Sequence, residues 1–221
     1  MSHARSLSAR AVSCSPRAGG NSDRMATLFA EGFAASGHAM DVTPLRQHDI
    51  RPCIACYRCA HDPHGWCYLE ETDSSAPAFS ILMKAPVLFL SIPIFFYHVP
   101  AHMKAWIDRS QAYWLRREKG DEQLTSLPQR PAYLAMVAAR SRGERTFEGA
   151  LLTLRYFLKT FNFEIQEPLL LPGHDGPESI AASPEAREQV LQYGRDAGQR
   201  FSLESLSANL CENTACNATR P

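Results

Sequence analysis

Short segments of strand character alternate along this chain with longer segments of helical period, and this alternation constrains the fold most strongly. Apolar runs at 7–14, 39–45, 87–92, 132–138 and 164–171 predict five strands. Apolar residues recur at helical spacing between and after these runs. This order predicts an α/β fold: a doubly wound, five-stranded parallel sheet with helices on both faces.

The predicted helices lie at 21–37, 77–83, 100–117, 147–161 and 186–201. Two further segments lack a sustained period. The first, 46–73, is polar and carries four of the seven cysteines, so we expect a cysteine-rich loop. The second, 207–221, has few large apolar residues and is expected to be a flexible tail. Residues 1–206 are therefore predicted to form one domain, with 46–73 as a loop within it.

Composition excludes several classes of partner. The 23 basic and 23 acidic residues give a net charge of zero, whereas proteins that bind nucleic acids or membrane surfaces normally carry a basic excess. Residues 1–10 lack the apolar core of a signal peptide. The most apolar stretch, 85–99, is too short to span a bilayer and contains Pro86 and Pro93. We expect a cytoplasmic protein without nucleic-acid or membrane partners.

The loop at 13–22 follows the first predicted strand, where ligands bind in doubly wound sheets. It combines hydroxyl groups, an arginine, two glycines and a helix N-terminus, so its backbone N–H groups can surround a phosphate. It lacks the G-x-G-x-x-G fingerprint and the lysine of a Walker loop. A phosphate monoester such as that of FMN is the expected ligand; the alternative is a plain glycine-rich turn.

The loop at 91–100 follows the third predicted strand and contains consecutive aromatic residues between two prolines. Large aromatic side chains in an exposed loop reduce solubility unless they contact something. A planar isoalloxazine ring is a suitable contact. The alternative is that Phe95 and Phe96 enter the core or a subunit interface.

These segments resemble one known family. Residues 15–22, S-P-R-A-G-G-N-S, resemble the phosphate loop S-P-R-x-x-G-N-S/T of the NADPH-dependent FMN reductases. Residues 91–96 and 104–109 are similar to that family's S-P-x-Y-F and L-K-x-F-I-D-R segments. The cysteine motif of 52–59 with Cys67 resembles that of the iron–sulfur flavoproteins within the family.

The resemblance implies a flavodoxin-like fold with one FMN per subunit and assembly as a homodimer or homotetramer, with the flavin near the interface. The loop at 15–22 would hold the phosphate, the loop at 93–96 would line the ring, and Arg140 would lie near the pyrimidine edge. At 97–100, Tyr-His-Val-Pro replaces the family's usual small residues and can narrow access to the flavin. The residues expected at the cofactor are Ser15, Arg17, Gly20, Asn21, Ser22, Pro93, Ile94, Phe95, Phe96 and Arg140.

The spacing C-x2-C-x2-C, with a fourth cysteine after seven more residues, supplies the four thiolates that a [4Fe–4S] cluster requires. The expected metal ligands are Cys53, Cys56, Cys59 and Cys67. A zinc ion can use the same sulfur donors. Without a metal, these residues would be free thiols, or a redox-active pair of the C-x-x-C type.

The leading interpretation is an FMN-dependent oxidoreductase that passes electrons between FMN and a [4Fe–4S] cluster or small acceptors. NAD(P)H or a ferredoxin would be its donor or partner. No residue in the sequence requires a general-base or nucleophile role, so no catalytic side chain is assigned. Three alternatives stay open: a cluster-free NAD(P)H-dependent FMN or quinone reductase, a non-enzymatic flavodoxin-like electron carrier, and a cofactor-free interaction protein.

Overall fold

The computed structural model describes residues 8–143 and 145–217. Leu7, most of segment 1–10 and the last four residues of the predicted tail lie outside the described residues. The strands are β1 (Ala9–Ser13), β2 (Met40–Pro44), β3 (Leu88–Pro93), β4 (Arg130–Ala138), β5 (Phe163–Ile165) and β6 (Leu169–Pro172). The longer helices are α1 (Asn21–Ala34), α3 (Ser75–Lys84), α4 (Ala101–Arg109), α5 (Gln111–Glu118), α7 (Glu148–Lys159) and α9 (Pro184–Asn217).

All strands belong to one parallel sheet in the order β2-β1-β3-β4-β5, with β6 also paired to β4. The direction in which the chain adds strands reverses between β1 and β3, so the sheet is doubly wound and this is its switch point. The central strands β3 and β4 are buried along almost their whole length, as a parallel sheet covered on both faces requires. The predicted fold class is confirmed.

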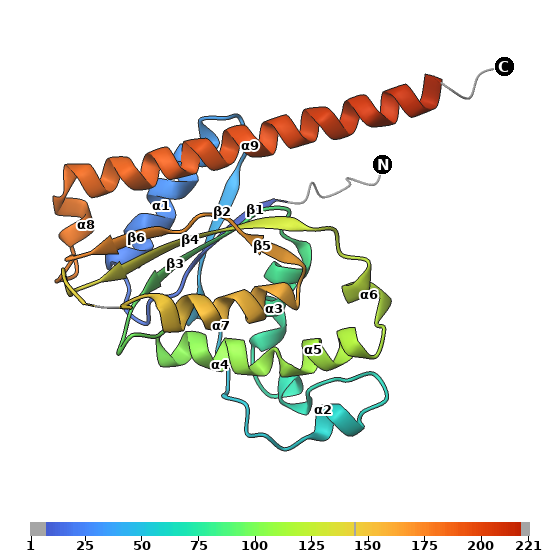
Figure 1. The fold of residues 1–221 in the computed structure, drawn as a ribbon. Coiled ribbons are helices and arrows are strands. Elements are labelled where there is room, and N and C mark those ends of the chain that lie inside the picture. The colour runs from blue at the N-terminus through green and yellow to red at the C-terminus, as the bar shows by residue number, and fades with distance from the viewer. Residues whose placement is uncertain (1–7, 144, 218–221) are drawn as a thin grey trace.

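Helices cover both faces of the sheet (Figure 1). On one face α1 packs against α9, with Phe29 stacked on Phe89 of β3 at a centroid distance of 3.8 Å. On the other face α3, α4, α5 and α7 enclose a second apolar core around Trp106 and Phe79. The carboxyl ends of β3, β4 and β6 point toward the same edge of the molecule (Figure 1), and this edge carries the loops predicted to bind a ligand.

The fifth strand differs from the prediction. Instead of one strand at 164–171, β5 and β6 pair in succession with β4, through Ala132↔Ile165 and Ala135↔Leu169. Three residues between the strands stand opposite two residues of β4, which is the geometry of a bulge. Pro168 lies in this bulge and has no N–H group to donate to the ladder.

The helix predicted at 100–117 is divided into α4 and α5 at Ser110. The Ser110 hydroxyl donates a 2.6 Å hydrogen bond to the carbonyl of Ile107, a local bond that competes with regular helix geometry. Trp114, which the pattern placed on the buried face, is 45% exposed.

The final helix is longer than predicted. It continues to Asn217, although the pattern placed its end near 201 and a flexible tail from 207. The chain contains no glycine or proline between Gly198 and Pro221, so the two residue types that most oppose helix propagation are missing from this segment.

Short helices also occur where only loops were predicted: η1 (Leu45–Gln47), α2 (Arg58–His61), η2 (Tyr68–Glu71), α6 (Glu122–Thr125) and α8 (Ser179–Ala182). Among the described residues, no helix is both long and apolar enough to cross a membrane.

Candidate functional site

The loop after β1 leads directly into the N-terminus of α1. The backbone N–H of Arg17 donates to the Ser15 hydroxyl (3.2 Å), and Gly19 turns the chain with a φ of 69°. A methyl group at Gly20 would lie 3.4 Å from Nε of Arg17, so the missing side chain gives room to this guanidinium. The loop therefore wraps tightly around the start of the helix.

Ser22 lies in the first turn of α1 and is only 1% exposed. Its Oγ atom is buried and has no hydrogen-bond partner, although most buried hydroxyl groups have one. Its carbonyl accepts a 2.7 Å hydrogen bond from the Ser91 hydroxyl, which joins the first turn of α1 to the end of β3. The first N–H groups of α1 also have no acceptor within the helix. The site thus offers unused donors beside the switch point.

An acidic residue in the same turn is neutralised. The Asp23 carboxylate accepts two 2.8 Å hydrogen bonds from Arg46 and one of 2.7 Å from the Gly19 N–H, together with a bond from Ser13. Burial favours the neutral carboxyl, but these hydrogen bonds outweigh it and hold the pKa of Asp23 below its ordinary value. The paired carboxylate leaves the helix N-terminus able to attract an anion.

The loop after β3 begins beside β4, because the Ile94 N–H donates to the Val137 carbonyl (2.8 Å). Phe95 and His98 then exchange two backbone hydrogen bonds of 2.9 and 3.0 Å, which closes a two-residue turn. The central residues of this turn, Phe96 and Tyr97, have φ values of 49° and 63°. These values belong to a type I′ turn, which normally uses asparagine and glycine.

Both loops line one pocket of about 260 Å³ at the carboxyl edge of the sheet. Seven of the ten predicted cofactor residues lie in its wall: Ser15, Arg17, Asn21, Ser22, Pro93, Ile94 and Phe95.

Three predicted cofactor residues lie elsewhere. Gly20 is buried beside the Arg17 side chain, whereas Phe96 and Arg140 are exposed, and none of the three lines the pocket. Arg140 Nη1 donates to the Tyr97 hydroxyl (3.2 Å). In this structure Arg140 contacts the aromatic turn, and its position near the pyrimidine edge of a flavin stays a prediction.

Sequence reasoning missed the third wall of the pocket, which the loop after β6 supplies through His174, Asp175 and Gly176. The Asn21 side chain joins this loop to the start of α1, directly after the loop that follows β1. Its Nδ2 donates to the Gly176 carbonyl (2.8 Å) and to Ser179 Oγ (2.9 Å), and its Oδ1 accepts from the Ile180 N–H. Position alone, at the carboxyl end of the last strand, could have indicated this loop.

The four clustered cysteines also share a cavity, of about 430 Å³, between the loop at 46–73 and helices α4 and α5. Burial raises the pKa of Cys59, and the nearby thiols of Cys67, Cys53 and Cys56 raise it further. Ala55 and Tyr57, on either side of Cys56, adopt left-handed backbone conformations. However, within residues 8–143 and 145–202, whose side chains the structure describes, no three His, Cys, Asp or Glu side chains converge closely enough to hold a metal ion.

The cysteine loop is anchored firmly to the domain. The Arg109 guanidinium, 1% exposed, contacts the buried Asp73 carboxylate at 2.5 Å and the Arg51 carbonyl at 3.1 Å. Lys119 donates to the Asp62 carbonyl (2.8 Å). These contacts fix both ends and the middle of the loop.

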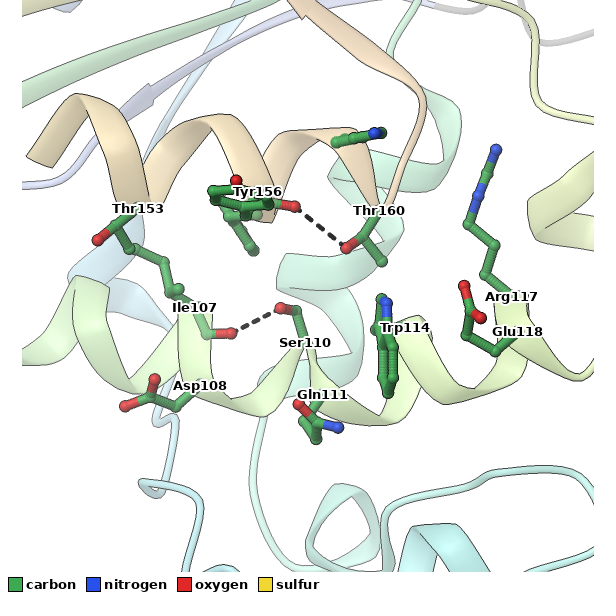
Figure 2. A pocket seen from close by; sticks show the side chains of 12 residues that line it. Ile107, Asp108, Ser110, Gln111, Trp114, Arg117, Glu118, Thr153, Tyr156 and Thr160 are labelled. Carbon is green, nitrogen blue, oxygen red and sulfur yellow. Dashed lines mark hydrogen bonds between the residues drawn. The ribbon is translucent and has the colours of Figure 1, made fainter.

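A larger groove of about 750 Å³ lies between α4–α5 and α7 (Figure 2). Trp114 and Tyr156 face this groove and are 45% and 67% exposed. Among the residues predicted for the cofactor or metal, none lines it. Its lining combines exposed aromatic rings with charged side chains, among them Asp108, Arg117 and Lys159.

Several solved structures share this fold. A flavone reductase superposes with a TM-score of 0.64 and 16% identity, over 87% of this chain and 62% of that protein. This chain thus spans less than two thirds of that reductase. An NAD(P)H:quinone oxidoreductase from Methanothermobacter marburgensis superposes with a TM-score of 0.62 and 17% identity, over 89% of this chain and 99% of that protein. RosB, with a bound formylriboflavin phosphate intermediate, superposes with a TM-score of 0.55 and 16% identity, over 97% of this chain and 88% of that protein.

No protein of curated function matches the sequence. A family model for the flavodoxin-like fold matches residues 10–193, which is most of the chain. Together with the observed strand order, this match shows that the chain belongs to the flavodoxin-like family.

Proposed function

We propose that this chain is an FMN-dependent oxidoreductase that transfers electrons from NAD(P)H to a quinone or a similar small acceptor. The observation that carries the proposal is the buried, unpartnered Ser22 hydroxyl in a pocket formed by loops from β1, β3 and β6. Similar structures with reductase names support it. The net reaction moves a hydride from NAD(P)H and a proton from water to the quinone, giving NAD(P)⁺ and hydroquinone.

The residues of the pocket fit FMN. Ser15, Ser22 and the free N–H groups of α1 would bind the phosphate, with Arg17 supplying positive charge at the rim. Pro93, Ile94 and Phe95 would contact the isoalloxazine ring, which supplies the hydride-transfer chemistry when bound. Asn21 would position the third loop rather than bind phosphate through its side chain.

The test is FMN loading followed by anaerobic NAD(P)H oxidation with a quinone. We expect stoichiometric FMN uptake and acceptor-dependent oxidation. Negligible oxidation with every small acceptor would instead support an electron carrier, and failure to take up FMN would support a cofactor-free interaction protein.

A [4Fe–4S] cluster on Cys53, Cys56, Cys59 and Cys67 is a second, separate part of the proposal. It is supported by the shared cavity and by the left-handed residues around Cys56, since such turns direct N–H groups toward anionic clusters. Binding would have to draw the thiols together, because metal binding and local folding are coupled.

Anaerobic purification with iron, sulfide and flavin analysis tests the cluster. Cys59→Ser should lose iron, whereas Cys211→Ser, outside the loop, should retain it. Full iron in Cys59→Ser would exclude the four-cysteine ligand set. Flavin bands alone in the wild-type spectrum would support the cluster-free reductase, which the similar structures favour.

Assembly as a homodimer or homotetramer belongs to the same proposal. Trp114 and Tyr156 on the groove of Figure 2 support a contact with a second copy, because aromatic residues are enriched at interfaces. Light scattering should give an assembly mass that is a multiple of the 24.6 kDa chain mass. The substitution Trp114→Glu should lower this assembly mass. A monomeric wild type would contradict this part.

A cytosolic location completes the proposal, since the described cysteines are free thiols and a reducing compartment preserves them. A ferredoxin is the proposed partner if the donor is a protein rather than NAD(P)H. Oxidation of reduced ferredoxin by the FMN-loaded protein, measured beside NADH and NADPH, would identify the donor.

A further inference from the structure

The aromatic turn beside the flavin pocket places its most apolar side chain in solvent. Phe96 is fully exposed, with a relative accessibility of 101%, and Tyr97 is 44% exposed. Both residues are held at positive φ, where a bulky side chain is uncommon because it approaches the backbone closely. Neither burial nor backbone preference therefore accounts for phenylalanine at this position.

The turn is nevertheless rigid. Its ends are joined by the two backbone bonds between Phe95 and His98. Arg140 fixes the Tyr97 hydroxyl (3.2 Å), and His98 Nε2 lies 3.0 Å from Thr153 Oγ1 on α7.

A close backbone contact adds to these tethers. A methyl group at Gly149 would lie only 3.0 Å from the Tyr97 carbonyl oxygen, so glycine allows the turn to approach α7. Strained residues that their surroundings hold in place are concentrated at ligand-binding sites.

The pocket itself indicates what such a turn can contact. Its volume of about 260 Å³ lies below the roughly 300–1,000 Å³ of pockets that bury a small ligand. A bound flavin would thus extend past the pocket wall, of which Phe95 is part. The next residue, Phe96, does not line the pocket and is fully exposed, so its ring is accessible beside that wall.

We propose that Phe96 is a substrate-specificity residue, an aromatic platform on which a planar acceptor such as a quinone stacks beside the flavin. This inference rests on the proposed reductase function. Aromatic rings pair favourably in offset or edge-to-face arrangements, so the platform selects flat, extended acceptors over compact ones. The tethers from Arg140 and Thr153 hold the platform in place before the acceptor arrives.

The test compares Phe96→Asn with wild type. Asparagine suits a left-handed turn position, so this variant removes the ring and keeps the fold. We expect kcat/KM for a planar quinone to fall about tenfold, which corresponds to the loss of one aromatic pair and its buried area. The kcat/KM for ferricyanide, which needs no stacking, and the Kd of FMN should stay unchanged. Leu152→Gln, an equally simple loss of an exposed apolar side chain on α7, should change none of these values.

Three results would overturn the platform. An unchanged kcat/KM for the quinone would exclude a contact with the acceptor. A weaker FMN affinity in Phe96→Asn would indicate that the Phe96 ring contacts the flavin. A lower oligomeric mass of this variant would indicate that the ring lies between two copies of the chain.

A binding measurement separates this inference from the proposed function. If FMN-loaded wild type oxidises no NAD(P)H, calorimetry with a redox-inactive hydroxycoumarin still tests the platform. Weaker binding to Phe96→Asn supports it, and equal binding contradicts it.

Discussion

The unpartnered hydroxyl of Ser22 gives an uncommon combination of expected effects at the residue scale. Replacing Ser22 by alanine removes a buried polar atom that has no partner, so the apo-protein should be equally stable or slightly more stable. If FMN binds as proposed, the same change would also remove a hydrogen-bond donor to its phosphate, and hydrogen bonds to charged groups contribute about 1.5–3 kcal/mol. We expect the Kd of FMN to rise at least tenfold. Flavin fluorescence and urea unfolding of the apo-protein measure the two effects.

A matched variant, Thr27→Ala, removes a hydroxyl further along α1 that bonds only to the Asp23 carbonyl. It should leave the Kd of FMN unchanged. Equal FMN affinity in Ser22→Ala and wild type would remove Ser22 from the binding site.

The ion pair of Asp73 and Arg109 governs how the cysteine loop responds to acid. Burial favours the neutral carboxyl, but hydrogen bonds from Ser75, Arg109 and the Arg51 N–H outweigh it and hold the pKa of Asp73 below its ordinary value. A depressed pKa stabilises the fold above the ordinary value of about 3.9, and this contribution is lost as pH falls through the lower folded value. Acid should therefore loosen the loop below about pH 4.

Asp73→Asn tests this pair at neutral pH. Because it leaves the Arg109 charge buried without its partner, we expect a loss of about 3–5 kcal/mol in the free energy of unfolding. Asp108→Asn, which breaks the exposed pair with Lys104, should change it by less than about 1 kcal/mol. Similar losses in the two variants would contradict the structural role of Asp73.

At the scale of whole elements, regular apolar patterns predicted strands and helices correctly, whereas local departures from these patterns were missed. The alternation of strand-like and helical segments was sufficient to predict the five strand positions of the sheet and the longer helices. The bulge at Pro168 and the helix break at Ser110 each depend on the hydrogen bonding of a single residue, and apolar periodicity carries no information about such bonds. The extension of α9 was missed because low hydrophobicity was taken to indicate a tail, whereas a polar segment without glycine or proline can also continue a helix.

The contact of α1 with α9 depends on glycine at their closest approach. A methyl group at Gly194 would overlap the carbonyl oxygen of Phe29, which is backbone and cannot rotate away. We expect Gly194→Ala to lower the free energy of unfolding by about 1–3 kcal/mol, despite the higher helix propensity of alanine. Urea unfolding should detect this loss, and Gln199→Ala on the exposed side of α9 should not show it.

Across the whole molecule, the site was predictable in part because its loops occupy the switch point of the sheet. Sequence motifs located the loops after β1 and β3. They could not locate the loop after β6, whose His174 and Asp175 match no phosphate or flavin motif. Nor could they determine that Phe96 faces solvent, since this direction follows from two left-handed residues in succession.

Because the proposed ligand contacts three loops of the folded chain, its binding should stabilise the entire domain. FMN at 100 times its Kd would add about 2.7 kcal/mol, which corresponds to a rise of about 5–11 °C in Tm for a chain of this size. Circular dichroism at helix wavelengths measures Tm without interference from flavin fluorescence. Riboflavin, which lacks the phosphate, should give a smaller rise at the same concentration. Ser22→Ala should reduce the rise with FMN toward that with riboflavin, and equal rises for the two ligands in wild type would show that the loop at 15–22 does not bind phosphate.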